Sequence, residues 1–310
     1  MSTDTQPDIT SRPTGRAARE RLYHAVFFLC AFLSVVVTVS IIFLLARDAI
    51  GFFSVVSPAE FFLGTEFVAS KGQFGVLPLV SGTVLVTVIS ALIAIPIGVA
   101  AAVYLSEYAS DRMRSILKPG LEILAGIPTV VYGFFALVYV TPFLRVVGIP
   151  VATFNVLAAS LMVGIMIIPM VSSLSEDAMS AVPDSLRQAG YGLGATKFDV
   201  TIRVVIPAAL SGIISSFILA LSRAIGETMI VAVAMGLSPQ MFDPSDPLGN
   251  VLGNGQTMTS KMVQVVGSEL AGSGPGYKSL FAIGITLFAI TFLMNLISDR
   301  IAARYKEEYE

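Results

Sequence analysis

The chain has 310 residues, of which 55% are hydrophobic and only 13% are charged, and its mean hydropathy is +0.82. Soluble domains carry close to a quarter charged residues, so this composition excludes an ordinary soluble protein and indicates an integral membrane protein. The net charge is −2 and no basic patch suited to nucleic acid is present, so no nucleic acid is expected as a partner.

Cys30 and His24 are the only cysteine and the only histidine. The chain therefore cannot form an internal disulfide, a cysteine metal site or a histidine pair for a metal. Cys30 lies within an apolar run, where a small buried residue is expected, and His24 lies at a predicted membrane boundary, where no catalytic role is expected. We expect no catalytic residue, no metal site and no cofactor on this chain.

The N-terminal region consists of a polar segment followed by an apolar run. Residues 1–22 are expected to form a disordered cytoplasmic tail. The run 25–46 is long enough to cross a bilayer, and no small-residue cleavage site follows it. It is predicted to be an uncleaved first transmembrane helix, residues 23–46, rather than a signal peptide.

Five more apolar runs of spanning length follow, which predicts an all-α membrane protein with six transmembrane helices. These runs are 79–105, 121–144, 154–174, 208–235 and 280–302. The core 79–302 then holds five helices, a cytoplasmic loop 176–207 and an external loop 236–279. An external loop 47–78 and a cytoplasmic tail 303–310 complete the chain.

The distribution of lysine and arginine predicts the orientation, because cytoplasmic loops carry an excess of both residues. With the N-terminus inside, the cytoplasmic segments hold 13 of them and the external segments 5, while Arg223 lies inside a span. Both termini are therefore predicted to be cytoplasmic.

Each external loop contains an apolar pattern of its own. Aromatic residues gather in the loop 47–78, which favours an interfacial helix: Phe52, Phe53, Phe61, Phe62 and Phe67. In the loop 236–279, apolar residues recur at helical spacing and predict a short amphipathic helix: Met258, Met262, Val265, Val266 and Leu270.

The stretch 188–207 is a polar, glycine-punctuated island between two long apolar runs. Pro183 and Asp184 predict the start of a short helix, and Gly190, Gly192 and Gly194 predict its end. Thr196 is expected to cap a second short helix with Asp199 three residues on, and Phe198, Ile202 and Val205 to share one face of it. A helix of this size suits insertion into a groove on another protein.

This island resembles the cytoplasmic loop of ABC-importer permeases, which carry Glu-Ala-Ala, then Gly, then Ile-x-Leu-Pro at fixed spacing. Here the matching positions are Gln188-Ala189-Gly190, then Gly194, then Val204, Ile206 and Pro207. The departures are Gln188 for Glu, Gly190 for the second Ala, Val204 for Ile and Ile206 for Leu. The resemblance implies a type I importer permease fold in which 184–207, including Arg187, couples the chain to an ATPase.

Further segments resemble the C-type permease subunit of phosphate-specific ABC importers. They are FGVLPLVSGT at 74–83, LAGIPTVVYGFF at 124–135, RAIGETM at 223–229, TMTSKMVQ at 257–264 and LFAIGITLFAITFLMN at 280–295. The resemblance implies a multi-pass protein of the bacterial inner membrane that moves inorganic phosphate. It also implies an A-type permease partner, an ATPase dimer and an external phosphate-binding protein.

Arg223 and Glu227 are two ionisable residues inside the predicted fifth span. Four positions apart in a helix they would share a face, and ionised groups at membrane depth line a cavity or pair. Arg223 is our candidate for binding a phosphate anion, with Glu227 holding it or accepting a hydrogen bond from a protonated phosphate oxygen. An Arg–Glu pair that only joins helices is the alternative.

A hydroxyl stripe on the second span, Thr83, Thr87 and Ser90, is expected mainly to bond a neighbouring helix, with a substrate contact as the second interpretation. For Gly126, Gly133 and Gly164 we expect close helix packing, and for Asn295 packing or a substrate contact.

The chain has no phosphate-binding loop of the GxxxxGK[ST] type, so ATP and its Mg²⁺ are expected on a separate ATPase. The alternatives are a permease for another oxyanion, such as sulfate or molybdate, or a secondary transporter that needs no ATPase. No internal repeat of the kind typical of secondary transporters is present.

Overall fold

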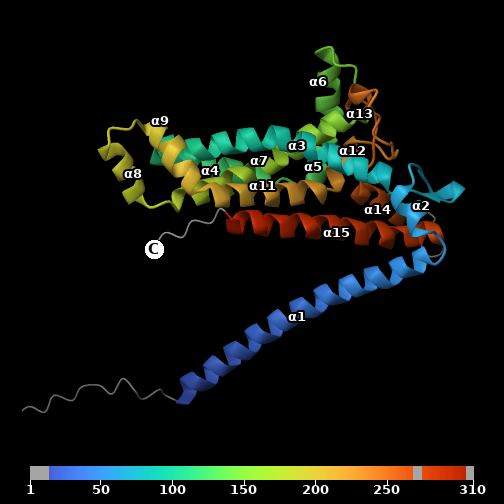
Figure 1. Ribbon diagram of the computed structural model, residues 1–310, viewed down its shortest axis with the longest axis horizontal. Coiled ribbons are helices and arrows are strands. Elements are labelled where there is room, and N and C mark those ends of the chain that lie inside the picture. Colours follow the sequence, from blue (N-terminus) through green and yellow to red (C-terminus); the bar gives the residue numbers. More distant parts are fainter. Residues whose placement is uncertain (1–13, 268–273, 305–310) are drawn as a thin grey trace, which may run out of the picture.

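The computed structural model describes residues 14–267 and 274–304, which form an elongated bundle of helices with one small hairpin (Figure 1). The longest helices are α1 (Thr14–Phe53), α3 (Leu77–Val103), α7 (Val156–Ser180), α11 (Leu210–Ile225) and α15 (Pro275–Arg304). A further span is built from α5 (Thr129–Phe135), the π-helical turn η3 (Ala136–Val140) and α6 (Thr141–Val146).

Within these ranges, five helices are long and apolar enough to cross a membrane, and six if one bent pair counts as a single span. The bent pair is Lys197–Ala208 with Leu210–Ile225, which meet at 69°. With this pair counted, the number agrees with the six predicted spans. The all-α prediction is confirmed, with two short strands as the exception.

The two ends of the bundle carry different elements (Figure 1). One, here the α8 end, holds α8 (Asp184–Gly192), α9 (Lys197–Val200), the π-helical turn η4 (Thr201–Val205) and α10 (Ile206–Ala208). The other, here the α14 end, holds α2 (Pro58–Leu63), α12 (Met229–Ala234), α13 (Pro247–Leu252) and α14 (Met258–Val266). The first described residues of α1 and the last of α15 lie toward the α8 end.

The centre of the bundle is held together by α3, α7 and α11. Small residues permit close contact, since a Cβ on Gly98 would lie 2.7 Å from the Val171 side chain. Two buried hydroxyl contacts add to the packing: Ser90 donates to the Ser160 carbonyl at 2.9 Å, and Ser175 and Ser216 are 2.8 Å apart. Ser90 therefore bonds a neighbouring helix, as predicted.

The α14 end is closed by aromatic packing rather than by one interfacial helix. Phe52 and Phe53 finish α1, Phe61 and Phe62 belong to α2, and Phe67 lies in β1. Strand β1 (Phe67–Val68) pairs antiparallel with β2 (Gln73–Phe74) across the 3-10 turn η1 (Ala69–Lys71). The rings meet mostly edge to face at about 5–6 Å, a geometry that aromatic pairs prefer.

Helix α14 confirms the amphipathic helix predicted in the loop 236–279, and Leu270 lies outside the described residues. Met258 and Val265 are buried, while Val266 is exposed. Lys261 lies over the Phe67 ring at 4.9 Å, and burial lowers the pKa of its ammonium group.

Three predicted boundaries are wrong. Helix α1 already begins at Thr14, so 14–22 are helical rather than disordered, while 1–13 lie outside the described residues. The predicted span 121–144 is divided by extended backbone at Ile127 and Pro128, because a residue before proline avoids the helical region. Its first part belongs to a separate helix, α4 (Asp111–Gly126).

The third error concerns the predicted span 208–235. Helix α11 ends at Ile225, and α12 starts again at Met229. Gly226, Glu227 and Thr228 form the break, so Arg223 and Glu227 do not share a helix face.

Candidate functional site

The glycine-punctuated loop folds as two short helices that project from the α8 end. Helix α8 starts after Pro183, carries Asp184 in its first turn and ends at Gly192. Gly194 follows with φ of +81°, a left-handed conformation that a side chain would strain. The predicted helix and its glycine-terminated end are both confirmed.

Gly190 is the position where the chain departs from the second alanine of the ABC-permease motif. A Cβ there would lie 2.9 Å from a methyl group of Val200, on the helix that follows the turn. The glycine therefore allows α8 and α9 to pack closely in this chain. Gln188 and Ala189 lie on the exposed side of α8.

Helix α9 is capped as predicted, since the Thr196 hydroxyl accepts from the Asp199 amide at 3.2 Å. The same hydroxyl donates to the Asp199 carboxylate at 2.6 Å. The predicted common face is wrong, because the π-helical turn η4 adds a residue to the helical repeat. Val205 is buried, whereas Phe198 and Ile202 stay exposed.

Apolar side chains project from this loop. Leu193 is 90% exposed, and Tyr191, Phe198 and Ile202 are exposed as well. Pro207 lies in the first turn of α10, just before the 69° bend into α11. The loop thus presents an apolar surface to its surroundings and continues directly into a helix of the bundle.

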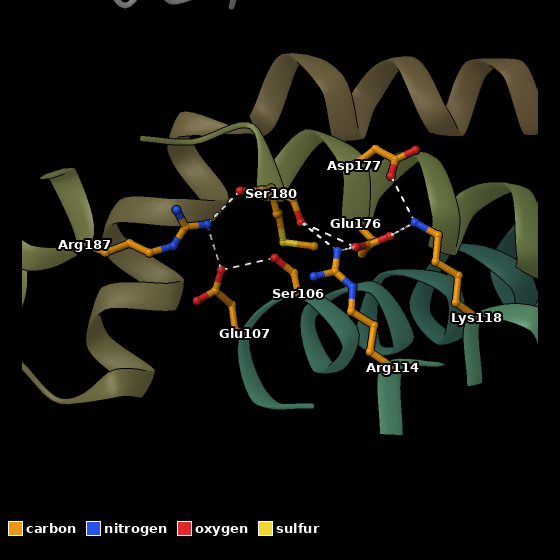
Figure 2. A network of polar contacts seen from close by, with 9 residues as sticks. Ser106, Glu107, Arg114, Lys118, Glu176, Asp177, Ser180 and Arg187 are labelled. Carbon is orange, nitrogen blue, oxygen red and sulfur yellow. Dashed lines mark hydrogen bonds and ion pairs between the residues drawn. The ribbon is translucent and has the colours of Figure 1, made fainter. Parts of the chain in front are cut away.

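Arg187 points the other way, into the protein (Figure 2). Its side chain is only 15% exposed, and the guanidinium donates to the Glu107 carboxylate at 3.1 Å and to the Met179 carbonyl at 2.8 Å. A further contact joins it to Asp184 at 3.2 Å. Glu107 is a buried residue of the π-helical turn η2 (Tyr104–Tyr108), so Arg187 ties α8 both to η2 and to the last turn of α7.

A second ionic group lies one helical turn back along α7 (Figure 2). The Glu176 side chain is 0% exposed, and its carboxylate binds Arg114 and, at 2.7 Å, Lys118, both from α4. Asp177, 63% exposed, also contacts Lys118 at 3.3 Å, and Ser180 lies 3.3 Å from Arg114. This group was not predicted, because Arg114 and Lys118 counted only among the 13 lysines and arginines of the predicted cytoplasmic segments.

Arg223 lines a cavity of about 470 Å³ between α4, α7 and α11. The other polar residues on its wall are Lys118, Glu122, Ser173 and Glu176, and the remainder is apolar. Among the residues that the structure describes, no carboxylate pairs with the Arg223 guanidinium. Within this part of the chain, the Arg223 cation thus lies on the wall of a mostly apolar cavity without a carboxylate partner, a setting that suits an anion.

Glu227 is buried in the break between α11 and α12, where it acts as a cap. Its carboxylate accepts from the backbone amides of Met229 at 2.9 Å and Ile230 at 3.2 Å. Its backbone carbonyl accepts from Thr259 of α14 at 2.6 Å. The predicted pairing with Arg223 is therefore wrong, because the carboxylate is held by the start of α12.

Thr83 and Thr87 are buried on α3, and their hydroxyls donate to helix carbonyls one turn back. Thr83 also accepts from the Met258 amide at 3.1 Å, so it holds the start of α14. Gly133 and Gly164 are close-packed as expected, while Gly126 has open space around it, contrary to expectation. Asn295 of α15 accepts from Ser222 of α11, a packing contact.

The sequence matches the family described as "Binding-protein-dependent transport system inner membrane component" over residues 94–307. Two relatives are a probable ABC transporter permease protein, YqgH, of Bacillus subtilis and a phosphate transport system permease protein, PstC, of Mesorhizobium japonicum. The first is 33% identical and the match covers 89% of each chain; the second is 31% identical, covering 93% of this chain and 91% of the relative.

Solved structures give the same fold. A chain of a bacterial alginate ABC transporter superposes with a TM-score of 0.64 at 14% identity, over 95% of this chain and 98% of that one. A chain of the MetNI methionine ABC transporter superposes with a TM-score of 0.54 at 20% identity, over 75% of this chain and 95% of that one.

Proposed function

The chain belongs to the family of binding-protein-dependent transport system inner membrane components, and from this premise we propose that it carries inorganic phosphate in an ATP-driven importer. Its multi-pass helices place it in the inner membrane as an importer permease. Phosphate as substrate is supported by the resemblance in 223–229 and by relatives whose names state phosphate transport.

The observation that carries the proposal is the Arg223 guanidinium on the wall of the cavity, which has no carboxylate partner among the residues that the structure describes. Arg223 lies in the last turn of α11. Insertion scales give a cost of about 2.5–3.5 kcal/mol for an arginine at a helix centre, and an ionisable residue within a span normally lines a pathway or pairs. A guanidinium offers a planar fork of donors that fits two oxygens of a phosphate ion. Arg223 would therefore bind the anion at the middle of its route.

The remaining candidates take different roles. Glu227 shapes the break that ends α11 two residues after Arg223, and a contact between its carboxylate and a protonated phosphate oxygen stays a prediction. For Thr83 and Thr87 we infer packing of α3 against α14, because both hydroxyls already have protein partners.

Coupling to an ATPase is proposed through 184–207. The exposed apolar side chains Tyr191, Leu193 and Phe198 form a knob of the kind that fits a groove on a partner. In this proposal the α8 end faces the cytoplasm, and an ATPase dimer carrying ATP and Mg²⁺ lies beneath it. A push on α8 would reach η2 and α7 through Arg187, and α11 through α10.

The other proposed partners are an A-type permease, an external phosphate-binding protein and membrane lipid. The apolar part of helix α1 has no buried residue in its most hydrophobic stretch. This surface is therefore available to lipid and to the second permease.

The test is phosphate uptake by the assembled transporter with Arg223→Gln, with Arg47→Gln as a control that removes an exposed arginine far along α1. Arg223→Gln is expected to abolish uptake at normal membrane levels, while Arg47→Gln keeps it. Wild-type uptake by Arg223→Gln would disprove the pathway role. Uptake of sulfate but not phosphate by the wild type would favour the alternative of another oxyanion.

A further inference from the structure

Glu176 is a fully buried carboxylate that the proposed anion route does not use. It lies on α7 at the edge of the cavity that contains Arg223. Each of its oxygens holds a cation from α4, with Oε1 on Arg114 and Oε2 on Lys118. A buried carboxylate between two cations is costly to desolvate and strongly resists loss of its partners.

Helix α4 forms one wall of the same cavity but is weakly attached elsewhere. Lys118, Leu121, Glu122 and Ala125 line the cavity, yet no side chain of α4 is fully buried. Extended backbone precedes the helix at Ala109 and Ser110 and follows it at Ile127 and Pro128. Near its far end, Tyr132 donates to the Leu124 carbonyl at 2.7 Å.

These features describe a wall with extended backbone at both ends and one strong ionic attachment near the α8 end. We propose that Glu176 is a positioning residue for transport: by holding Arg114 and Lys118 it keeps α4 closed over the cavity. Release of this grip lets α4 swing away and opens the cavity toward the α8 end. The inference rests on the proposed function for its direction, since the α8 end is taken as cytoplasmic.

The position of Glu176 also connects the movement of α4 to α8. Arg187 of α8 donates to the Met179 carbonyl, less than one turn from Glu176 on the same helix. A movement of α8 therefore displaces the turn of α7 that carries Glu176. The contacts of Arg187 and Glu176 with α7 and α4 thus form a continuous mechanical connection from the proposed ATPase surface to the wall of the cavity.

The test measures access to the cavity without using phosphate. Cys30, the only cysteine, is replaced by Ser, and the cavity-lining Ser173 is replaced by Cys. A membrane-impermeant maleimide is then applied to inside-out vesicles that contain the assembled transporter. Glu176→Gln is expected to raise the labelling rate about tenfold, as loss of about 1.4 kcal/mol of closure would.

Asp177→Asn is the matched control, because it removes the neighbouring carboxylate, which is 63% exposed and also contacts Lys118. Exposed pairs contribute little, so labelling is expected to change less than about twofold. Equal labelling in wild type and Glu176→Gln would overturn the proposal, even if phosphate uptake is normal. If Glu176→Gln alters labelling but the transporter does not move phosphate, the role of Glu176 in holding α4 is supported and phosphate is rejected as the substrate.

A second measurement does not depend on the folding of Glu176→Gln. Leu121→Cys on α4 and Ser173→Cys on α7, in the Cys30→Ser background, place one thiol on each of two helices that line the cavity and keep both ion pairs of Glu176. A reversible bis-thiosulfonate cross-link between α4 and α7 is expected to stop uptake, and reductant is expected to restore it. Full uptake by the cross-linked protein would overturn the proposal.

Discussion

Arg187→Gln is the substitution that most directly tests how α8 is attached to the bundle. It removes the cation that pairs with Glu107 and the donor to the Met179 carbonyl. The Glu107 side chain is 4% exposed and would keep only the Ser106 hydroxyl, at 3.2 Å, as a partner. The variant therefore leaves a buried carboxylate with no countercharge at this site.

The expected cost follows from that burial. Removing one member of a buried pair costs about 3–5 kcal/mol, because the remaining charge stays desolvated. The Arg187 side chain is 15% exposed, so solvent screening reduces the expected cost below this range, to about 2–3 kcal/mol. The double variant Glu107→Gln with Arg187→Gln should be about 2 kcal/mol more stable than Arg187→Gln alone, since no unpaired charge remains.

The assay combines thermal unfolding in detergent, followed by circular dichroism, with the ratio of phosphate taken up to ATP hydrolysed. Arg187→Gln should lower the unfolding temperature and uncouple hydrolysis from uptake. Asp184→Asn serves as the control, because this carboxylate is 86% exposed and its loss should have little effect. Additive costs of Glu107→Gln and Arg187→Gln would refute the reasoning, since they would mean that the two residues do not interact.

Three other predictions concern backbone space and charge. Gly98→Leu places a side chain where even a Cβ lies 2.7 Å from Val171, so it should destabilise the bundle by about 1–3 kcal/mol in thermal unfolding, whereas Gly126→Ala, with open space, should be neutral. Gly194→Val must adopt φ of +81°, at a cost of about 1–2 kcal/mol, and should weaken co-purification of the ATPase; an unchanged yield would contradict the coupling role. Burial lowers the pKa of Lys261, so in alkaline solution the folded state binds fewer protons than the unfolded chain. From about pH 8 to 10.5 the wild type should therefore gain stability relative to Lys261→Gln. A free energy of unfolding that falls relative to that of Lys261→Gln over this range would contradict the reasoning.

The parts of the fold that follow from local pattern could be predicted from sequence. Long apolar runs report membrane spans, and the island 188–207 stands out because polar residues and glycines interrupt those runs. The glycines and Pro183 also fixed the ends of α8, since these residues act on their own backbone. Arg223 was identifiable because an ionisable residue is rare inside a span.

The missed features depend on partners far away in sequence. Glu176 binds cations that lie 62 and 58 positions earlier, and Arg187 binds a carboxylate 80 positions earlier. Helical periodicity carries no information on such pairs. A local clue to α4 did exist, because Arg114 and Lys118 are four apart and share one face of a helix that begins at a serine cap.

The break at Gly226–Thr228 was missed for a different reason. The apolar run continues on both sides of it, and a glycine inside such a run does not by itself predict the end of a helix. The break forms because the Glu227 carboxylate caps α12 and its carbonyl bonds Thr259. This contact with α14 is tertiary, so it could be seen only in the folded chain.

The most direct test of the central claim is ATP hydrolysis by the transporter reconstituted in liposomes with its ATPase, second permease and binding protein. Phosphate with binding protein should stimulate hydrolysis in the wild type and fail to do so with Arg223→Gln, and sulfate should have no effect. Stimulation by sulfate alone, or equal stimulation of wild type and Arg223→Gln by phosphate, would contradict the account.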